Sequence, residues 1–272
     1  MGPRAIASLL FLCLMTVGLA ALPAQAAPPK ATTLDYVAVG DSYTAGQGAP
    51  PYEAACYRSP FNSYPAKVDA LRGVALKFNA ACSGASTEDI PAQLPGDPGD
   101  LNYQDRSAGL VTVTVGGIDA GSNQVATACE GGVVDDDCKA LLTITAEEET
   151  ELEGKLAKAY SAIAEKYPAA TVAVMGYPKM FGGFYLWYDF PQALNHSIGE
   201  LDRIIMEQAA ASKVRFVDVR QEFGGHEIGS FQPWINYNSN DATDPSNFHP
   251  NATGYASGYY QALVNDGLIP RR

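Results

Sequence analysis

The chain has 272 residues, a formal net charge of −12 and five cysteines. Its length suits one large domain with a sizeable core. An acidic chain without basic clusters argues against a nucleic-acid-binding protein and against electrostatic docking on anionic membranes.

The first segment is typical of a targeting peptide. Arg4 precedes an apolar run over residues 5–22, and the tripeptide Ala24-Gln25-Ala26 follows. A charged start, an apolar run that is short for a membrane span and an A-x-A site predict a signal peptide over residues 1–26. We therefore expect a secreted, extracellular protein in which residues 27–272 form a single domain.

Strands and helices alternate along the rest of the chain. Apolar, β-branched runs predict five strands, over residues 34–39, 75–80, 109–115, 170–175 and 214–219. Apolar residues at helical spacing predict helices, over residues 147–167, 194–211 and 251–263. The alternation predicts an α/β fold, a three-layer αβα sandwich with a central parallel sheet of about five strands. Gly-, Pro- and Asp-rich stretches over residues 93–106 and 131–137 predict surface loops.

Four cysteines follow the predicted signal peptide, at positions 56, 82, 129 and 138. An even number in an exported chain predicts two disulfides, although four cysteines allow three pairings. Closure of the shorter loops favours Cys56–Cys82 and Cys129–Cys138. Because no CxxC pair is present, a zinc site is disfavoured, and we expect no metal and no cofactor.

The segment VAVGDSYTAG, residues 37–46, places an acid and a serine where an apolar run ends. If residues 37–39 form a central strand, Ser42 lies at its carboxyl end, where parallel sheets place their sites. A serine there needs a base before it acts as a nucleophile.

Three histidines are candidates for that base. His196, near a predicted helix start, is interpreted as a surface residue, and His226, in a Gly-rich loop, as a structural hydrogen-bonding group. His249 lies between Phe and Pro just before the last predicted helix. A histidine held in this way suits a fixed general base.

Four sequence blocks together resemble the SGNH (GDSL) hydrolase family. They are GDSYTAG from Gly40, CSGAST from Cys82, VTVGGIDA from Val113 and FHPNATGY from Phe248, and the ordered set spans nearly all of the predicted mature chain. The chain is most similar to secreted bacterial SGNH lipases and phospholipases A1, with which it shares Gly-His…Pro-Trp-Ile over residues 225–235.

The resemblance implies a serine ester hydrolase that acts on acyl lipids through an acyl-enzyme. Ser42 would be the nucleophile and would donate its backbone N–H to the oxyanion. Gly84 would supply a second backbone N–H, and His249 would transfer the proton. Asp41 is expected to shape the turn. The implied partner is an ester lipid at an interface, and we expect a monomer with no stable protein partner.

One departure from the family pattern concerns the oxyanion hole. The family's third block usually reads Gly-x-Asn-Asp, and the Asn side chain is a donor to the oxyanion. Here Ile118 stands in its place, between Gly117 and Asp119. Loss of one donor costs roughly 10²–10³ in rate, unless another amide such as Asn123 replaces it.

A second departure concerns the group that orients His249. The family pattern Asp-x-x-His would place an aspartate at position 246, where this chain has serine, and Asp244 lies two residues earlier. We favour a backbone carbonyl, of Ser246 or Asn247, over the Asp244 carboxylate as the group that orients the imidazole. With a backbone carbonyl in this role, Ser42 and His249 would form a Ser–His dyad.

The substrate class rests on the aromatic segment MFGGFYLWYDF, residues 180–190. At the carboxyl end of a strand it would form an apolar acyl pocket or a face that meets lipid, or else would pack in the core. Nearby Lys179, with Arg58, is a candidate phosphate contact or an ordinary surface charge. Two alternatives stay open: a carbohydrate acetylesterase, and a lipid- or carbohydrate-binding relative weakened in catalysis by Ile118.

Overall fold

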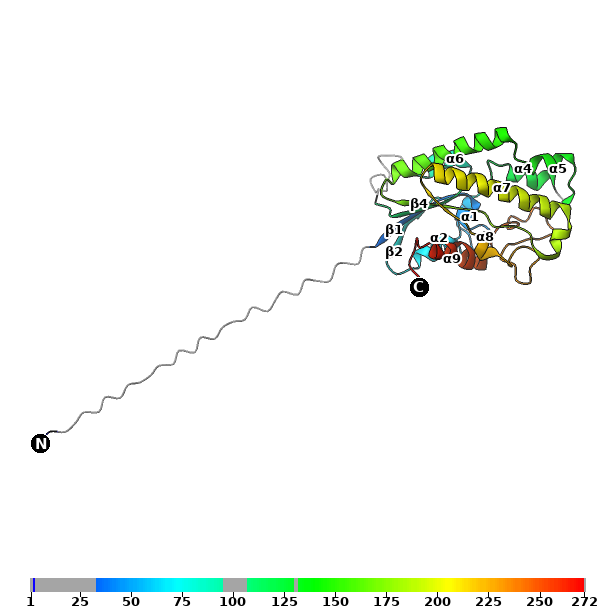
Figure 1. Cartoon of the computed structure of the whole chain (residues 1–272). Helices are drawn as coiled ribbons and strands as arrows, with labels where there is room; N and C mark the ends of the chain where they lie inside the picture. The colour runs from blue at the N-terminus through cyan, green and yellow to red at the C-terminus, as the bar shows by residue number, and fades with distance from the viewer. Residues whose placement is uncertain (1, 3–32, 95–106, 130–131, 272) are drawn as a thin grey trace. The chain divides into compact units, whose positions relative to one another are not determined.

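Five parallel strands form one sheet in the order β2-β1-β3-β4-β5 (Figure 1). They are β1 Leu34–Gly40, β2 Val74–Asn79, β3 Leu110–Thr114, β4 Thr171–Met175 and β5 Arg215–Val217. All five predicted strands are confirmed, with bounds within two residues of those expected. Every residue of β3, LVTVT, is buried, because a central parallel strand is covered on both faces.

The structure is a computed structural model that describes residues 2, 33–94, 107–129 and 132–271. Residues Thr32–Arg272 cluster in one compact unit. The predicted signal peptide, apart from Gly2, lies outside the described residues. Among the described helices, none combines the length and the apolar character that a membrane span requires.

Helices cover both faces of the sheet. The long helices α6 (Ala146–Lys166) and α7 (Asp189–Ala211) pack against each other on one face, whereas α2 (Tyr64–Asp69), α8 (Arg220–Phe223) and α9 (Tyr260–Asn265) lie on the other (Figure 1). The predicted αβα sandwich is therefore confirmed. Shorter helical elements connect these layers: α1 Ser42–Ala45, η1 Ala54–Cys56, η2 Thr87–Asp89, α3 Ile90–Gln93, α4 Ser122–Ala128, α5 Asp136–Leu141, η4 Gly183–Trp187 and η5 Gly254–Tyr259.

The start of each long helix has a local cause. Thr145 and Glu148 form a capping box before α6, in which the Glu148 carboxylate accepts the Thr145 N–H at 2.8 Å. Helix α7 begins at Asp189, five residues before the predicted start at residue 194. Pro191 falls in its first turn, where a helix needs no N–H donor, so the proline does not interrupt the helix.

The predicted terminal helix over residues 251–263 is two elements. A π-helical turn, η5 (Gly254–Tyr259), precedes α9, which ends at Asn265. The turn packs closely on Phe223, since a Cβ at Gly258 would lie 2.1 Å from the Phe223 ring. The last helix therefore continues past the expected end but departs from α-helical geometry where it meets this ring.

One predicted loop is partly wrong. Residues 136–137 belong to α5, which Asp135 caps by accepting the N–H of Cys138 at 2.9 Å. An aspartate-rich run ends in a cap because a carboxylate satisfies free amides at a helix start. Of the predicted loops, residues 95–106 and residue 131 lie outside the described residues.

The sheet order sets where a site can form. The chain leaves β1 toward β2 on one side and later returns to β3 on the other, so the order reverses between β1 and β3. In such sheets the crevice beyond the carboxyl ends at this reversal is the usual binding position. Gly40 at the end of β1 pairs with Thr114 at the end of β3, so the segments that follow both strands meet there.

Candidate active site

Ser42 is the first residue of α1, two residues after β1 ends at Gly40. Gly40 has a φ of 132°, and a Cβ there would lie 2.4 Å from the carbonyl oxygen of Thr114, so only glycine fits. The Asp41 carboxylate caps α1 by accepting the N–H of Tyr43 at 2.9 Å. The turn therefore holds Ser42 at the end of a buried strand.

Ser42 and His249 are separated by 207 positions in the chain and are in direct contact. Nε2 of His249 lies 2.8 Å from Oγ of Ser42. Nδ1 of the same ring lies 2.8 Å from the carbonyl oxygen of Asn247. Because a carbonyl only accepts hydrogen bonds, Nδ1 carries the proton and Nε2 accepts from the serine hydroxyl. This tautomer suits a general base toward Ser42.

The three candidates for orienting His249 occupy different positions. Only the carbonyl of Asn247 contacts the ring, whereas the carbonyl of Ser246 accepts the backbone N–H of His249 at 3.1 Å. The Asp244 carboxylate accepts the backbone N–H of Ser246 at 2.9 Å and its hydroxyl at 2.7 Å. These hydrogen bonds hold the pKa of Asp244 below its usual value.

Burial decides the charge of His249. Desolvation lowers the pKa of the imidazole from 6.5 to about 4, and the hydrogen bond to Asn247 opposes this shift. None of the described hydrogen bonds joins a carboxylate to the ring. The histidine is therefore neutral at pH 7, the form that a general base requires.

The two backbone N–H groups expected to hold an oxyanion have no hydrogen-bond acceptor among the described residues. In the part of the chain that the structure describes, no group accepts a hydrogen bond from the N–H of Ser42 or of Gly84, and both residues line the same cavity. Gly84 adopts a φ of 80°, a left-handed conformation that favours glycine. Free amides beside the serine hydroxyl are the chemistry that stabilises a developing alkoxide.

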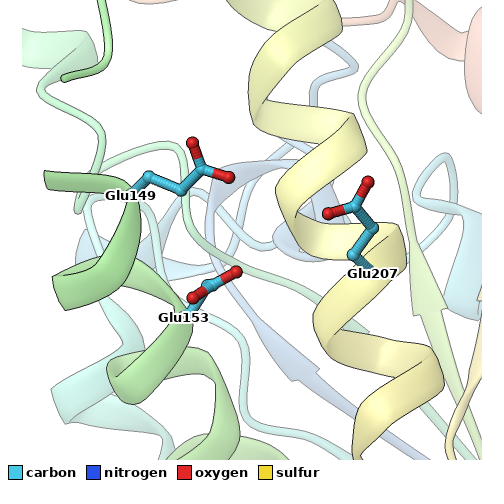
Figure 2. A group of neighbouring side chains, drawn as sticks. All are labelled: Glu149, Glu153 and Glu207. Atoms are coloured by element: carbon cyan, nitrogen blue, oxygen red, sulfur yellow. The ribbon is translucent and has the colours of Figure 1, made fainter. Parts of the chain in front are cut away.

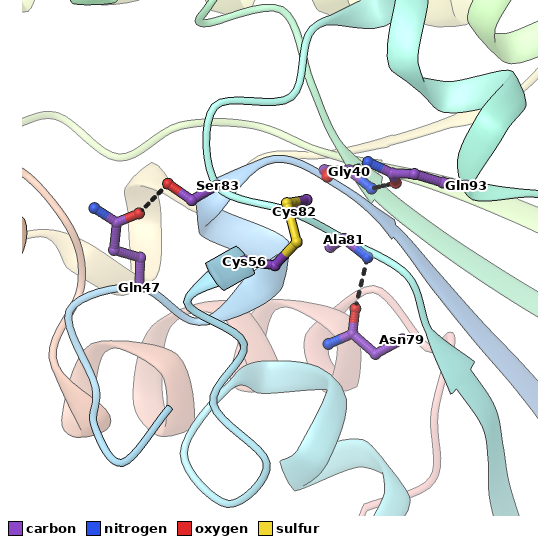
Figure 3. Close-up of a disulfide and its surroundings, with 8 residues drawn as sticks. All are labelled: Gly40, Gln47, Cys56, Asn79, Ala81, Cys82, Ser83 and Gln93. Carbon is purple, nitrogen blue, oxygen red and sulfur yellow. Dashed lines mark hydrogen bonds between the residues drawn. A yellow bond between two sulfur atoms is a disulfide. The ribbon is translucent and has the colours of Figure 1, made fainter. Parts of the chain in front are cut away.

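A disulfide anchors the loop that carries Gly84 (Figure 3). Cys56 is bonded to Cys82, and the N–H of Cys82 donates to the carbonyl of Gly40 at 3.0 Å. The second bridge joins Cys129 to Cys138, so both predicted pairings are confirmed. The first bridge ties the loop to η1, and the hydrogen bond of Cys82 ties it to the end of the strand that precedes Ser42.

Ile118 lines the cavity without offering a hydrogen-bond donor. Its neighbour Asp119 is engaged elsewhere and accepts the N–H and the hydroxyl of Thr87 at 2.9 and 2.7 Å. Asn123 from α4 lines the same cavity, which keeps it a candidate for the missing amide.

Asp41 links the serine turn to the loop after β3. The Tyr177 hydroxyl donates to the Asp41 carboxylate at 2.5 Å and accepts the N–H of Gly117 at 3.0 Å. Burial raises the pKa of Asp41 to about 7, which the hydrogen bonds from Tyr177 and the amide of Tyr43 oppose. Each of these contacts is made to neighbouring structure, in agreement with a role in shaping the turn.

Three polar residues that the sequence analysis did not single out support the histidine. The Tyr43 hydroxyl donates to the carbonyl of Phe248 at 2.5 Å, and the side-chain amide of Gln47 donates to the carbonyl of Pro245. The side-chain amide of Asn236 donates to the carbonyl of His249 at 3.0 Å. The sequence carries one signal for Gln47, a polar residue between two glycines shortly after Ser42.

An apolar cavity of about 280 Å³ extends from the Ser42–His249 pair. Two helices form its walls, α4 and α7. The α7 residues that line it recur at helical spacing, so one face of that helix points into the cavity; they are Phe190, Leu194, Ile198 and Leu201. Val125 and Ala126 from α4 also line it. An apolar cavity with a few polar groups at one end is typical of a ligand site.

The aromatic segment over residues 180–190 is divided between cavity, core and surface. Met180 and Phe190 line the cavity, and Phe181 is fully buried. Phe184 and Trp187 are exposed. The segment therefore contributes side chains to the cavity lining, to the core and to the surface.

The remaining candidate residues do not line the cavity. His196 is exposed on α7, and His226 stacks on Trp234 with ring centroids 3.6 Å apart. Lys179 and Arg58 are half-buried away from the cavity lining.

Three glutamates on α6 and α7 form the group of described carboxylates closest to a metal-binding arrangement (Figure 2). They are Glu149, Glu153 and Glu207. Arg203 already pairs with two of them, at 2.9 Å from Glu149 and 3.1 Å from Glu207. The guanidinium offsets part of the negative charge there, and we assign this cluster no function.

Comparison with known proteins identifies relatives over most of the chain. Residues 38–257 match the family described as GDSL-like Lipase/Acylhydrolase. The chain is 36% identical to Lipase 1 of Streptomyces coelicolor over 253 residues, which cover 89% of this chain and 90% of that protein.

Two solved structures have the same fold. The phospholipase A1 of Streptomyces albidoflavus superposes with a TM-score of 0.74 at 32% identity, over 86% of this chain and 99% of that one. The extracellular lipase of Streptomyces rimosus superposes with a TM-score of 0.72 at 32% identity and the same coverage.

Proposed function

Because this chain belongs to the GDSL-like lipase/acylhydrolase family, we propose that it is a secreted serine ester hydrolase of acyl lipids, a lipase or phospholipase A1. One observation carries the proposal: the 2.8 Å contact between Nε2 of His249 and Oγ of Ser42 at the end of an apolar cavity. The two disulfides and the extracellular lipase among the relatives support secretion.

In the first half of the reaction, Ser42 Oγ attacks the ester carbonyl carbon while His249 Nε2 takes the hydroxyl proton. The carbonyl oxygen becomes an oxyanion, held by the N–H groups of Ser42 and Gly84. The tetrahedral intermediate then collapses. The ester C–O bond breaks, the imidazolium gives its proton to the departing alcohol, and an acyl-serine remains.

In the second half, water attacks the acyl-serine and His249 takes one of its protons. The second tetrahedral intermediate releases the carboxylic acid, and the proton returns to Ser42 Oγ. Throughout, the Asn247 carbonyl holds Nδ1 protonated. A carbonyl stabilises imidazolium less than a carboxylate does. The imidazole of this dyad is therefore protonated less readily than that of a triad and stays neutral to a lower pH.

The apolar cavity favours a long-chain acyl ester over an acetyl ester as the substrate. Leu194, Ile198 and Val125 give it apolar walls, which a hydrocarbon chain would cover. A carbohydrate acetylesterase would need a polar, shallow site instead. In our proposal the acyl chain lies between α4 and α7, with the ester at Ser42.

Labelling with a fluorophosphonate tests the nucleophile. The folded wild-type protein should react, and Ser42→Ala should not. No adduct on folded wild-type protein would favour the binding relative that Ile118 suggests. Chain-length profiling on nitrophenyl esters then tests the substrate class, and a preference for acetate over longer chains would overturn the lipid assignment.

A further inference from the structure

Four exposed aromatic side chains gather on two neighbouring segments. Phe184 is 52% exposed, Trp187 83% and Tyr188 57%, all in or beside η4, and Phe231 is 98% exposed. No residue of η4 is buried. We call these four side chains the aromatic face. Soluble proteins seldom expose large apolar side chains together unless they bind something there.

Backbone contacts hold the two segments side by side. The N–H of Ile228 donates to the carbonyl of Met180 at 2.8 Å, and the N–H of Gly182 donates to the carbonyl of Ile228 at 2.9 Å. The loop after Ile228 also packs closely, since a Cβ at Gly229 would lie 2.5 Å from the Tyr185 ring. These contacts anchor the backbone of the two segments that carry the aromatic face.

Packed aromatic rings connect the aromatic face to the wall of the cavity. Phe184 stacks on Tyr185 at 4.4 Å, Tyr185 contacts Phe181 at 5.2 Å, and Phe181 contacts Phe248 at 6.1 Å. Phe248 precedes His249 and lines the cavity. One chain of packed rings thus leads from the surface to the Ser42–His249 pair.

The charges beside this face select the kind of surface that would cover it. The flanking residues carry one cation, Lys179, and two carboxylates, Asp189 and Glu227, in a chain of net charge −12. Anionic lipid would be repelled, whereas tryptophan and tyrosine favour the boundary between hydrocarbon and water.

We propose that the aromatic face inserts into uncharged or zwitterionic lipid and delivers an acyl ester to the adjoining cavity. This inference rests on the proposed function and names the surface on which that function takes place. A protein of this kind binds by apolar burial, so its attachment should not need anionic headgroups.

Trp187 is a natural reporter of insertion, because it is one of only two tryptophans. The other, Trp234, is half-buried and stacked on His226. Vesicles of phosphatidylcholine, added to the Ser42→Ala variant so that they are not consumed, should shift the emission to shorter wavelength. Trp187→Phe in that background should abolish the shift.

Binding and turnover then test the aromatic face itself. Trp187→Ser/Phe231→Ser should lower binding to these vesicles, and their hydrolysis, by about tenfold or more, because two aromatic side chains no longer leave water. Hydrolysis of a monomeric, short-chain nitrophenyl ester should stay within about twofold, since neither side chain lines the cavity.

Met206→Ser is the matched control, an exposed apolar side chain on α7 about 24 Å along the helix from Phe190. Met206→Ser should leave vesicle binding unchanged. The thermal midpoints of Met206→Ser and of Trp187→Ser/Phe231→Ser should equal that of the wild-type protein.

Three results would overturn the proposal: equal vesicle binding by the double variant and the wild type, binding only to phosphatidylserine vesicles, or a dimer that the double variant dissociates. If the wild-type protein did not hydrolyse the short-chain ester, the proposed function would be refuted instead. The two failures are distinguishable because vesicle binding is measured separately, on Ser42→Ala.

Discussion

Ser42 and His249 meet at 2.8 Å, yet regular structure holds the first and a network of loop contacts holds the second. Ser42 follows a buried strand, a glycine that the neighbouring strand requires and an aspartate cap. His249 ends an irregular segment over residues 236–249. Asn236 and Asn247 within the segment, and Tyr43 from α1, donate hydrogen bonds to its carbonyl groups.

This difference teaches where each region is sensitive. The serine turn depends on the backbone geometry at the end of a buried strand. Side-chain changes elsewhere in the strand should therefore disturb the position of Ser42 little. The histidine loop depends on individual side chains, each of which satisfies a backbone group. In particular, Asn238 N–H donates to the Asn247 side chain at 2.6 Å, and that side chain donates to the carbonyl of Asp241 at 2.8 Å.

The largest effect tests whether the two regions act as one unit. His249→Ala should lower kcat for a nitrophenyl ester by roughly 10³–10⁴-fold or more, because Ser42 loses its base. Adding Ser42→Ala should cause little further loss, since both residues serve one step. His196→Ala, on the exposed side of α7, is the control and should keep nearly full activity. Independent, multiplicative losses would argue against a shared mechanism.

Breaking the disulfide beside the serine turn tests how much that region needs a covalent support. Cys56→Ser/Cys82→Ser should lower the free energy of unfolding by about 3–4 kcal/mol, because the bridge closes a loop with a sequence separation of 26. Cys129→Ser/Cys138→Ser, with a separation of 9, should cost about 2–3 kcal/mol. Urea denaturation of both variants gives the comparison, and a larger cost for the shorter loop would contradict it.

The pH profile tests the burial of the histidine. A depressed pKa means that the neutral, active imidazole persists as the pH falls from 7, and is lost as the pH falls through about 4. At pH 5 an unshifted imidazole would be neutral in only roughly 3% of molecules, so kcat/KM there should exceed that expectation by roughly thirtyfold. An acid limb near pH 6.5 would show that burial does not govern this group.

Circular dichroism at each pH controls for unfolding in that experiment. Burial raises the pKa of Asp41 and of Asp202 to about 7. A raised carboxyl pKa contributes stability that is complete below the unfolded value of 3.8 and is lost as the pH rises through about 7. These two groups therefore favour the folded state across the acid range in which His249 titrates.

Restoring an amide side chain at position 118, in the oxyanion hole, should raise kcat. Ile118→Asn is expected to raise kcat by about tenfold or more, because an added donor would stabilise the oxyanion. Ile118→Leu keeps the cavity apolar and should leave kcat close to the wild-type value. An unchanged kcat in Ile118→Asn would mean that the existing donors, with Asn123 among the candidates, already suffice.

The smallest effect should come from Asp244. Asp244→Ala is expected to change kcat/KM by less than about threefold, because its carboxylate bonds to Ser246 and does not reach the imidazole. Initial rates on the same nitrophenyl ester measure this directly. A loss as large as that of His249→Ala would replace the Asn247 carbonyl with a carboxylate as the orienting group.

Much of the fold follows from local patterns. Apolar, β-branched runs predicted each strand to within two residues, and helical spacing predicted α6, because both patterns record which side of an element is buried. The start of α7 and the existence of α5 were missed, since Pro191 and an aspartate run look like helix breakers until the cap geometry is known. Loop closure sufficed for both disulfides because their partners are near in sequence.

The histidine loop marks the boundary of such reasoning. Ser42, Gly84 and His249 were recognisable as residue types in ordered blocks, but no pattern distinguished the carbonyl of Asn247 from that of Ser246. That choice depends on a φ of 61° at Phe248 and on the hydroxyl of Tyr43, a residue more than 200 positions away.

The order of residues along the chain alone determines the layered α/β architecture, the cysteine pairs and the serine at a strand end, because burial and short-loop closure act over neighbouring residues. Only the tertiary structure decides which carbonyl orients the imidazole, which helices wall the cavity and which aromatic rings reach the surface. These depend on contacts between distant segments, whose energies are realised only when the sheet has brought them together.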